Sequence, residues 1–239
     1  MPTILKATEL TKRYGNVVAL DHLDLEVSAG ETVCLLGANG AGKSTTISLF
    51  LGFLKPSDGR AEVMGVDAAD RSRGVRQHLG YIPENVALYD ALSGAENLEV
   101  FERLGGGHAS RAALEGLLLE AGLPEDAIHR RAATYSKGMR QKVGIAIAMA
   151  KKARALLLDE PLSGLDPSAA NDFCALIRRF RDGGGAILMA THDIFRAKDV
   201  GTRIGIMRQG RLVEMLDPST LGAQEIEAIY LSHMQAGAA

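Results

Sequence analysis

Residues 37–45, GANGAGKST, match the pattern G-x-x-x-x-G-K-[ST] in full, and this feature constrains the fold more than any other. Its glycines let the backbone curl so that successive N–H groups point inward at an anion. A helix expected from Lys43 to about Phe53 adds its positive N-terminal end. The run ETVCLLG at 31–37 is apolar and ends at a glycine, as a buried strand does. The pattern therefore predicts a phosphate-binding loop between a strand and a helix.

The residues of this loop have separate expected roles. Lys43 supplies a positive charge to the β- and γ-phosphates of a nucleotide, and the Ser44 hydroxyl can bind Mg²⁺. A glycine-rich turn that matches by chance is the alternative, and the strand before it and the helix after it argue against that. The remaining residues expected to contact the nucleotide are Gly37, Asn39, Gly40, Ala41, Gly42 and Thr45.

A second apolar run, ALLLDEP at 155–161, ends in two adjacent carboxylates. The carboxyl ends of neighbouring parallel strands share one crevice, so we expect Asp159 to approach Mg²⁺ held at Ser44, directly or through water. Glu160 can then act as the general base on a water aligned with the γ-phosphate. The alternative is that both acids are solvated loop residues.

A third apolar run, MATHDI at 189–194, ends with His192. A lone histidine is more often structural than catalytic, whereas its place at a strand end favours a polar role near the γ-phosphate. Spacing alone leaves both interpretations open.

The order of elements predicts an α/β core interrupted by helices. Helical patterns run from about 85 to 152, with Ser93, Ser110 and Ser136 as expected N-caps, and return at 168–184 and 223–234. Residues 209 and 210 should join the last two strands as a hairpin. We expect one domain over 1–239, with a core at about 1–84 and 153–239 and a helical subdomain at about 85–152. Strands are expected at 4–10, 17–27, 31–37, 60–66, 155–160, 186–192, 203–210 and 211–216.

Composition and charge bear on the class of function. The formal net charge is −2 and no long basic run is present, which weakens a role in binding nucleic acid. No apolar run reaches the roughly 20 residues that span a bilayer, so a membrane role needs a partner. The N-terminal residues lack the layout of a signal peptide. Cys34 and Cys174 are expected to be buried, reduced thiols of a cytosolic protein, and the tail QAGAA to fray.

Taken together, these motifs resemble the nucleotide-binding domain of an ATP-binding-cassette (ABC) transporter over essentially the whole chain. YSKGM at 135–139 is similar to the signature of that family, usually L-S-G-G-Q; Ser136 and Gly138 match, and the other three positions depart. Ser136 and the following helix N-terminus still form an anion site. The resemblance implies that this site closes on the γ-phosphate bound to the other subunit, in a head-to-tail homodimer with two ATP at its interface.

The resemblance also implies a fold and further site residues. The fold is α/β, a P-loop NTPase core of mixed sheet flanked by helices, with an N-terminal antiparallel β subdomain and an inserted α-helical subdomain. Tyr14 is similar to the aromatic residue that stacks on adenine, although it could be an ordinary strand-end tyrosine. Asp166 in SGLD resembles the acid of the loop that crosses the dimer axis, and His192 the histidine that contacts the γ-phosphate. The implied cofactors are ATP and Mg²⁺.

Glu84, in GYIPEN, stands where the family usually has a glutamine that senses Mg²⁺ or water at the γ-phosphate. Like charges from Asp159, Glu160 and the polyphosphate are expected to raise the pKa of Glu84 unless Mg²⁺ offsets them. The residue could be neutral and act like the amide, or ionised and closer to the metal; a third interpretation turns it to solvent. We expect Glu84→Gln to leave ATP hydrolysis within about tenfold, because a neutral carboxyl and an amide are near isosteres.

The function implied is that of an ATP-hydrolysing subunit that drives a separate integral membrane permease from the cytoplasmic face of the membrane. Glu84, YSKGM and the single cassette resemble ATPases of ABC-2-type exporters, which include drug- and antibiotic-export systems. GYIPEN with YSKGMRQK is also similar to the ATPase of the copper-processing transporter of nitrous oxide reductase maturation. A soluble ABC ATPase of the ribosome or of DNA fits poorly, because the chain has one phosphate loop and no sustained heptads. A regulatory nucleotide sensor with negligible turnover is disfavoured, because the residues needed for hydrolysis, Asp159, Glu160 and His192, are all present.

The sequence leaves the packing of two surfaces undecided. The stretch 85–105 should form the groove for a coupling helix of the permease, with Tyr89, Leu92, Leu98 and Phe101 as its apolar part. Leu98 and Phe101 could equally be core residues of the helical subdomain. The helix at 223–234 has apolar Ile226, Ile229 and Tyr230 at helical spacing, and packs either on the core or on the second subunit. The transported substrate depends on the membrane subunit in this family.

Overall fold

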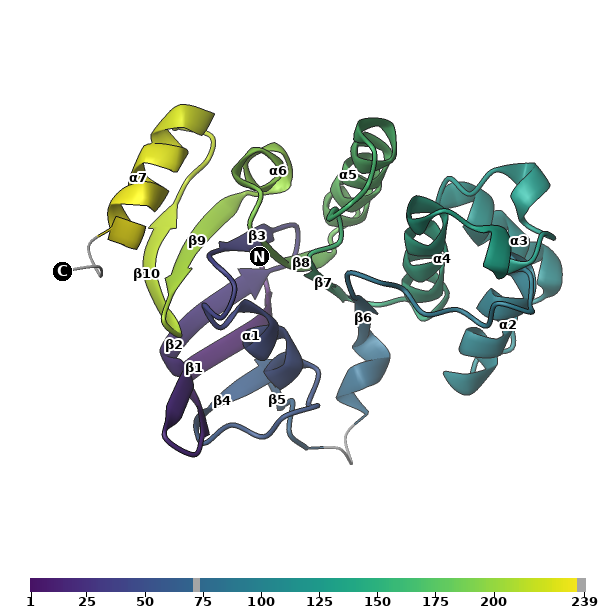
Figure 1. Ribbon diagram of the computed structural model, residues 1–239. Helices are drawn as coiled ribbons and strands as arrows, with labels where there is room; N and C mark the ends of the chain where they lie inside the picture. The colour runs from purple at the N-terminus through teal and green to yellow at the C-terminus, as the bar shows by residue number, and fades with distance from the viewer. Residues whose placement is uncertain (71–73, 236–239) are drawn as a thin grey trace.

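A computed structural model describes residues 1–70 and 74–235, and its smaller sheet is antiparallel (Figure 1). The strand order is β2-β1-β4-β5, with β1 at Thr3–Tyr14, β2 at Val17–Ser28, β4 at Asp58–Val63 and β5 at Val66–Asp67. In β2, Leu23, Leu25 and Val27 are buried and the residues between them are exposed. This alternation places one face of the sheet on the core, as the sequence pattern predicts.

The larger sheet has six strands in the order β10-β9-β3-β8-β7-β6. Five of them run parallel, and only β10 is antiparallel to its neighbour. Every residue of β3 and β8 is buried, which explains their unbroken apolar runs. The carboxyl ends of the parallel strands therefore meet at one edge. The bounds are β3 Thr32–Leu36, β6 Leu79–Ile82, β7 Ala155–Asp159, β8 Ala186–Thr191, β9 Arg203–Arg208 and β10 Arg211–Leu216.

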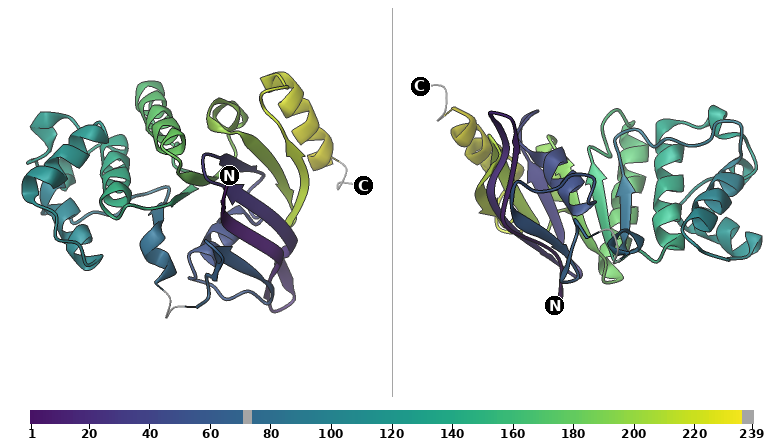
Figure 2. Two further views of the ribbon diagram at one scale, coloured as in Figure 1. Left: turned by 180° about the vertical axis from the view of Figure 1, so that it is seen from behind. Right: turned by 90° about the horizontal axis from the view of Figure 1, so that it is seen from below.

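Helices cover both faces of this larger sheet. Helix α1, Lys43–Phe50, lies between the two sheets and contacts β2 and β4 of one and β7 and β8 of the other (Figure 2). On the other face, helices α5, α6 and α7 lie over strands β8, β3 and β9. Their bounds are α5 Pro167–Asp182, α6 Ile194–Val200 and α7 Ala223–Gln235. The architecture confirms the predicted α/β fold with a mixed sheet.

Three further helices pack together at the side of the molecule beyond β6 (Figures 1 and 2). These are α2 at Gly94–Leu104, α3 at Arg111–Glu120 and α4 at Lys137–Ala150, with short 3₁₀ turns at Glu125–Ala127 and Ala132–Thr134. Ser93, Ser110 and Ser136 cap them, and Ser93 completes a capping box with Glu96. The helical insertion is therefore present, and α4 links it to the sheet by packing on β6.

Some predicted elements were wrong in their bounds. The first helix ends at Phe50 instead of Phe53, because Gly52 turns the chain with φ 62° close to the Ala68 carbonyl. The strand expected over 60–66 is interrupted by a turn at Met64 and Gly65, both with positive φ. The sequence analysis did not identify β6, α6 or the 3₁₀ turn Val75–His78. The hairpin turn at 209 and 210 is confirmed.

Helix α7 packs on the core of its own chain. Ile226 is fully buried, and Ile229 and Tyr230 pack partly buried against the same cluster. Arg208 and Glu214 of the adjacent hairpin also contact His233 in this helix. The question left open by the sequence is thus answered. The predicted fraying of QAGAA falls almost entirely on residues outside those described.

Two other predictions from the sequence concern the thiols and the bilayer. Cys34 and Cys174 are free and buried, and burial raises the pKa of Cys174 to about 11. Within residues 1–70 and 74–235, none of the helices combines the length and apolar character that crossing a bilayer demands.

The contact between β6 and α4 yields a stability prediction. A Cβ on Gly80 would lie 2.5 Å from the Ala148 Cβ and 2.7 Å from Leu156 Cδ2. We expect Gly80→Ala to lower the free energy of unfolding by about 1–3 kcal/mol in urea titrations, because the helix must shift. Gly116→Ala in α3 is the control: a Cβ there meets nothing within 4 Å, so alanine should stabilise by about 0.5–1 kcal/mol. Equal stability of the Gly80→Ala and unmodified chains would contradict this packing.

Candidate functional site

The predicted phosphate loop joins β3 to α1 at the carboxyl edge of the larger sheet. Gly42 caps α1 with φ 105°, and a Cβ there would lie 2.7 Å from the Ala19 carbonyl oxygen. A Cβ on Gly37 would lie 2.5 Å from the Met207 carbonyl oxygen. Both positions need glycine because the loop is pressed against β2 and against the end of β9. The glycine pattern therefore reflects close backbone contacts as well as loop curvature.

Lys43 is buried inside this loop. Its ammonium donates hydrogen bonds to the Gly37 carbonyl at 2.5 Å and the Ala38 carbonyl at 3.2 Å. Burial lowers the pKa of Lys43 from its ordinary value, while the charges of Glu160 and Asp159 act to raise it. The nearer carboxylate oxygen, Glu160 Oε1, lies 3.8 Å away. A cation is thus held where an anionic group entering the loop would meet it.

Ser44 and Asp159 come together as the sequence predicts. The Ser44 hydroxyl donates a hydrogen bond to Asp159 Oδ1 at 2.9 Å. Burial raises the pKa of Asp159; the hydrogen bond from Ser44 lowers it, and the charges of Glu160 and Glu84 raise it further. Hydroxyl and carboxylate oxygens suit Mg²⁺. Within the described part of the chain, no three His, Cys, Asp or Glu side chains gather into a metal site, so Mg²⁺ here would need phosphate and water oxygens too.

Glu160 and His192 form a pair beside Lys43. Glu160 follows β7 in a left-handed conformation, φ 49°, and its N–H donates to the Ala190 carbonyl at 2.9 Å. Its Oε2 lies 3.0 Å from His192 Nδ1. Its Oε1 is buried and has no hydrogen-bond partner among the described residues. One carboxylate oxygen is therefore anchored by His192, and the other, 3.8 Å from the Lys43 ammonium, keeps its capacity to accept a hydrogen bond from a bound water.

Glu84 lies close to this cluster, but its environment differs from the expectation. Its Oε1 accepts hydrogen bonds from the Ser163 hydroxyl at 3.0 Å and from the Lys137 ammonium at 3.4 Å. The Ser163 hydrogen bond and the Lys137 charge hold the pKa of Glu84 below its ordinary value. The increase in pKa that the sequence predicts counts the charge of a bound polyphosphate; in the chain without nucleotide the shift is in the opposite direction, because Ser163 and Lys137 lie beside Glu84. Glu84 is half exposed.

The contacts of Glu84 with Ser163 and Lys137 give a structural reason why Glu84→Gln should keep its activity. The glutamine carbonyl can still accept hydrogen bonds from Ser163 and Lys137, while the charge is lost. We expect steady-state ATP hydrolysis to remain within about tenfold of the unmodified chain, because the site keeps its hydrogen bonds. A loss of several hundredfold in a folded variant would show that the charge of Glu84 takes part in the reaction. Circular dichroism and thermal unfolding provide the control for folding.

The remaining predicted residues lie around the cluster and not within it. Ser136 caps α4 by accepting from the Met139 N–H at 3.3 Å, and Asp166 caps α5 by accepting from the Ala169 N–H at 3.0 Å. Gly138 packs on Ala169, where a Cβ would come within 3.2 Å of the alanine side chain. In one chain, these residues reach the phosphate loop only indirectly. Asn39 and Ser44 are exposed and Thr45 is partly exposed at the loop surface, whereas Ala41 is buried.

Tyr14 lies at the end of β1, opposite Val17. The ring is 48% exposed, and the Lys12 ammonium lies 5.1 Å from its centroid. Val17 begins β2, the strand whose Ala19 touches the phosphate loop at Gly42. The ring is thus available for stacking on the side of the molecule that carries the loop.

Sequence reasoning assigned no role to three residues that join the helical group to the catalytic edge. Lys137 and Ser163 bind Glu84, and the buried side-chain amide of Gln141 donates to the Pro161 carbonyl. Lys137 was visible only as a departure from the family signature. One signal in the sequence could have indicated the contact between Glu84 and Lys137. Both differ from the usual family residue, and the two replacements carry opposite charges.

A separate hollow of about 350 Å³ lies between the end of α1, strand β6 and helices α2 and α4. Two aromatic pairs flank it: Phe53 and Tyr81, with ring centroids 6.2 Å apart, and Tyr89 and Phe101, 6.0 Å apart. Phe53, Tyr81 and Tyr89 are each more than a third exposed. We call this hollow, with its two pairs, the aromatic groove.

The aromatic groove differs in part from the one predicted at 85–105. Phe101 lines it and Tyr89 stacks on Phe101. Leu98 is fully buried in the core of the helical group, so its alternative interpretation is correct. Leu92 lines a different hollow on the outer side of α2. Residues outside 85–105, such as Phe53 and Tyr81, contribute because the fold brings the end of α1 and β6 alongside α2.

Known proteins are similar to this chain in sequence and in fold. The family described as "ABC transporter" matches residues 20–163. The chain is 35% identical over 224 residues to the probable multidrug ABC transporter ATP-binding protein YbhF of Escherichia coli (strain K12), covering 93% of this chain and 38% of that protein. It is 34% identical over 215 residues to the bacitracin transport ATP-binding protein BcrA of Bacillus licheniformis, covering 90% and 70%. It is 36% identical over 232 residues to the daunorubicin resistance ATP-binding protein DrrA2 of Streptomyces coeruleorubidus, covering 94% and 71%.

Two solved structures extend the comparison. An ATP-binding subunit of an ABC transporter superimposes with a TM-score of 0.83 at 30% identity, covering 96% of this chain and 98% of that one. A dimeric ATP-binding cassette in a post-hydrolysis state, bound to ADP and Pi, superimposes with a TM-score of 0.81 at 25% identity, covering 90% and 99%.

Proposed function

The chain belongs to the ABC transporter family as an ATP-binding subunit, and from this premise we propose that it is the ATPase of an exporter, driving a separate membrane permease. The observation that carries the proposal is the convergence of Lys43, Ser44, Asp159 and Glu160 at the carboxyl edge of one sheet. Such a set serves phosphoryl transfer to water. We place the protein at the cytoplasmic face of the membrane, held there by the permease.

The residues of the cluster divide the chemistry between them. The loop backbone and Lys43 bind the phosphates of ATP, and Tyr14 stacks on the adenine. Ser44 and Asp159 would hold Mg²⁺, with Glu84 as a further candidate ligand, and the ion would neutralise phosphate charge when bound. Glu160 accepts the proton of the attacking water through Oε1, which has no hydrogen-bond partner among the described residues. His192, 3.0 Å from the other oxygen, orients this carboxylate and faces the γ-phosphate.

We further propose that two copies assemble head to tail around two ATP. Ser136 and Asp166 are exposed, and each caps a helix whose positive end is open to the surface. Such a helix end binds anions, so Ser136 and Gly138 of one copy would contact the γ-phosphate held by the other. The likeness to a dimeric cassette supports this arrangement.

The partner is an integral membrane subunit with a cytosolic helix that fits the aromatic groove. Exposed aromatic residues around a hollow are typical anchors of protein interfaces. The names of relatives support export of a drug or antibiotic. Copper-linked cargo stays a prediction from GYIPEN and YSKGMRQK. The soluble ABC ATPase remains the alternative that the experiment below must exclude.

The experiment is a pull-down of the tagged Glu160→Gln chain with ATP from detergent-solubilised membranes of the source cell, followed by mass spectrometry. Recovery of a polytopic membrane protein, absent when Lys43→Ala chain is the bait, would support the proposal and identify the permease. Recovery of ribosomes or DNA-associated proteins alone would contradict transport and leave the ATP site standing.

A further inference from the structure

A basic hollow adjoins the aromatic groove. It measures about 620 Å³ and is lined by Arg76, Gln77, His78, Gly105, Lys151, Lys152 and Arg154. Arg76 and Lys151 line the aromatic groove too, so the two hollows are continuous. None of the lining residues is acidic, although the whole chain has a net charge of −2. Positive charge is therefore concentrated at one end of the groove.

Two of these cations have structural roles. The Lys151 ammonium donates to the Arg76 carbonyl at 3.2 Å and the Leu79 carbonyl at 2.9 Å, and burial lowers the pKa of Lys151. The Arg76 guanidinium donates to the Leu51 and Gly52 carbonyls at 3.0 and 2.9 Å and lies 5.5 Å from the Phe53 ring centroid. These hydrogen bonds satisfy backbone carbonyl groups, and they are a sufficient reason for a cation at both positions.

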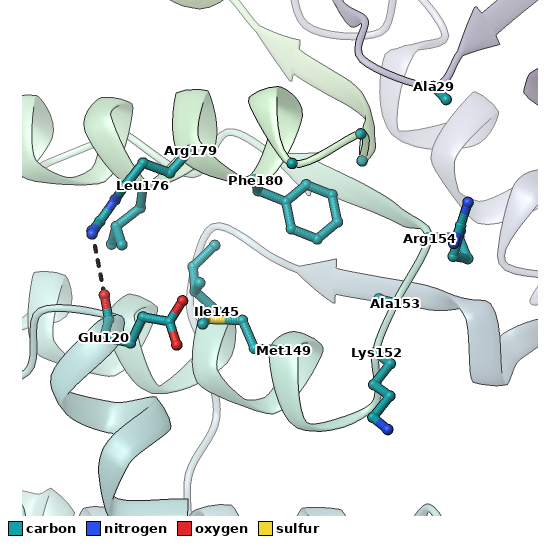
Figure 3. A pocket seen from close by; sticks show the side chains of 13 residues that line it. Ala29, Glu120, Ile145, Met149, Lys152, Ala153, Arg154, Leu176, Arg179 and Phe180 are labelled. Carbon is teal, nitrogen blue, oxygen red and sulfur yellow. Dashed lines mark hydrogen bonds between the residues drawn. The ribbon is translucent and has the colours of Figure 1, made fainter. Parts of the chain in front are cut away.

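Lys152 and Arg154 are different. Both are exposed, and their side chains have no hydrogen bond or ion pair within residues 1–70 and 74–235. Both also border a second hollow, drawn in Figure 3 with Glu120 and Phe180, where they lie on the connection from α4 to β7 with the Lys152 ammonium turned away from Phe180. A cation after the end of a helix also complements the helix dipole, which is a sufficient reason for Lys152. It does not explain Arg154, which precedes β7 and lies beyond α4.

We propose that the membrane-subunit helix seated in the aromatic groove carries an Asp or Glu at the end that lies over Lys152 and Arg154. The inference rests on the proposed function, and it adds the charge and orientation of the partner segment. The aromatic pairs accept apolar side chains, and the two unpaired cations accept a carboxylate. Charge at one end of an otherwise apolar groove fixes which way a helix lies, because the reversed orientation leaves the carboxylate unpaired.

A protein partner fits this surface better than a lipid headgroup does. Clusters that bind anionic lipid contain about 4–8 Lys or Arg residues. Here four lysine or arginine residues line the basic hollow, and two of them, Arg76 and Lys151, are engaged by backbone carbonyls and connect it to the aromatic groove. That leaves two cations unpaired within the described residues, fewer than such a cluster offers. The combination of an apolar groove and a small charged end is typical of peptide-helix recognition.

A zero-length cross-linker tests the contact directly. In the pull-down described above, a water-soluble carbodiimide activates a carboxylate; the Lys152 amine then attacks, an amide forms, and the carbodiimide leaves as a urea. We expect mass spectrometry to find the Lys152 peptide joined to an Asp or Glu in a cytosolic segment of the recovered membrane protein. Lys152→Arg keeps the charge but has no amine to react. It should lose the cross-link and keep the recovery.

Charge reversal tests the energetic role. We expect Lys152→Glu/Arg154→Glu to reduce recovery of the membrane protein at least about tenfold at low ionic strength, with the difference shrinking as salt rises. The matched control is Arg111→Glu/Arg131→Glu, which changes the net charge equally at exposed sites outside the groove. It should bind like the unmodified chain, since the surface ion pair of Arg111 with Glu115 contributes at most about 1 kcal/mol.

The outcomes separate this inference from the proposed function. Equal recovery by both reversed variants, with no cross-link at Lys152, would overturn the inference and leave the transporter assignment intact. Recovery of no membrane protein by any variant would overturn both. Binding of the purified chain to vesicles containing about 30% phosphatidylglycerol, lost in Lys152→Glu/Arg154→Glu, would assign the patch to lipid and refute a carboxylate partner.

Discussion

Glu160→Gln is expected to reduce ATP turnover by a factor between about 10² and 10⁴, the usual contribution of a general base. The amide cannot accept the proton of the attacking water, whereas its size and its contact with His192 are retained. ATP binding should survive, because Lys43 and Ser44 are unchanged. The nucleotide should therefore remain intact and hold two copies together, visible as an ATP-dependent shift from monomer to dimer in size-exclusion chromatography.

The matched control is Glu84→Gln, the same chemical change a short distance away. That variant should hydrolyse ATP within about tenfold of the unmodified chain and form no long-lived dimer. The comparison separates loss of the base from loss of any negative charge near the phosphates. A Glu160→Gln chain that stays monomeric with ATP and keeps its turnover would show that another group accepts the proton.

Lys43→Ala is expected to weaken ATP binding at least about 100-fold, because hydrogen bonds to a charged group contribute about 1.5–3 kcal/mol each and every 1.4 kcal/mol is tenfold. The alanine side chain can reach no phosphate. It also leaves the Gly37 and Ala38 carbonyls without the hydrogen bonds that the ammonium donates, so some stability should be lost. Isothermal titration calorimetry with ATP measures the affinity.

Lys151→Ala is the control for the structural part of that effect. Like Lys43, Lys151 is a desolvated lysine that donates to two backbone carbonyls, and burial lowers the pKa of both. Both variants should lose comparable stability in thermal unfolding. Only Lys43→Ala should lose ATP affinity. If Lys151→Ala weakened ATP binding as much, the loss in Lys43→Ala would reflect unfolding of the loop and not a missing phosphate contact.

Much of the nucleotide site was predictable because its parts are local in sequence. The residues from Gly37 to Ser44 are contiguous, and strand, loop and helix are set by neighbours a few positions away. Asp159 and Glu160 follow an apolar run directly, so the end of the strand positions them. Serine caps at 93, 110 and 136 were identified for the same reason: cap and first helical turn are adjacent in sequence.

Less was predictable where residues interact across the fold. Strand β6 has four residues, Leu79–Ile82, and among the described residues it pairs with β7 alone. Its own pattern was therefore too brief to identify. The aromatic groove combines Phe53, Tyr81 and Phe101, which are far apart along the chain. For Leu98 the sequence left a groove residue and a core residue as equal interpretations, and the packing of the helical group makes it fully buried.

By itself, the amino-acid sequence determined the phosphate loop, its acidic partners and the family, because each is written in a short continuous motif. The tertiary structure decided the direction in which the pKa of Glu84 shifts, because that shift depends on Ser163 and Lys137, 79 and 53 residues away. It also decided that Lys152 and Arg154 are unpaired beside a groove. Electrostatic interactions depend on distance in space, and a sequence gives that distance only for near neighbours.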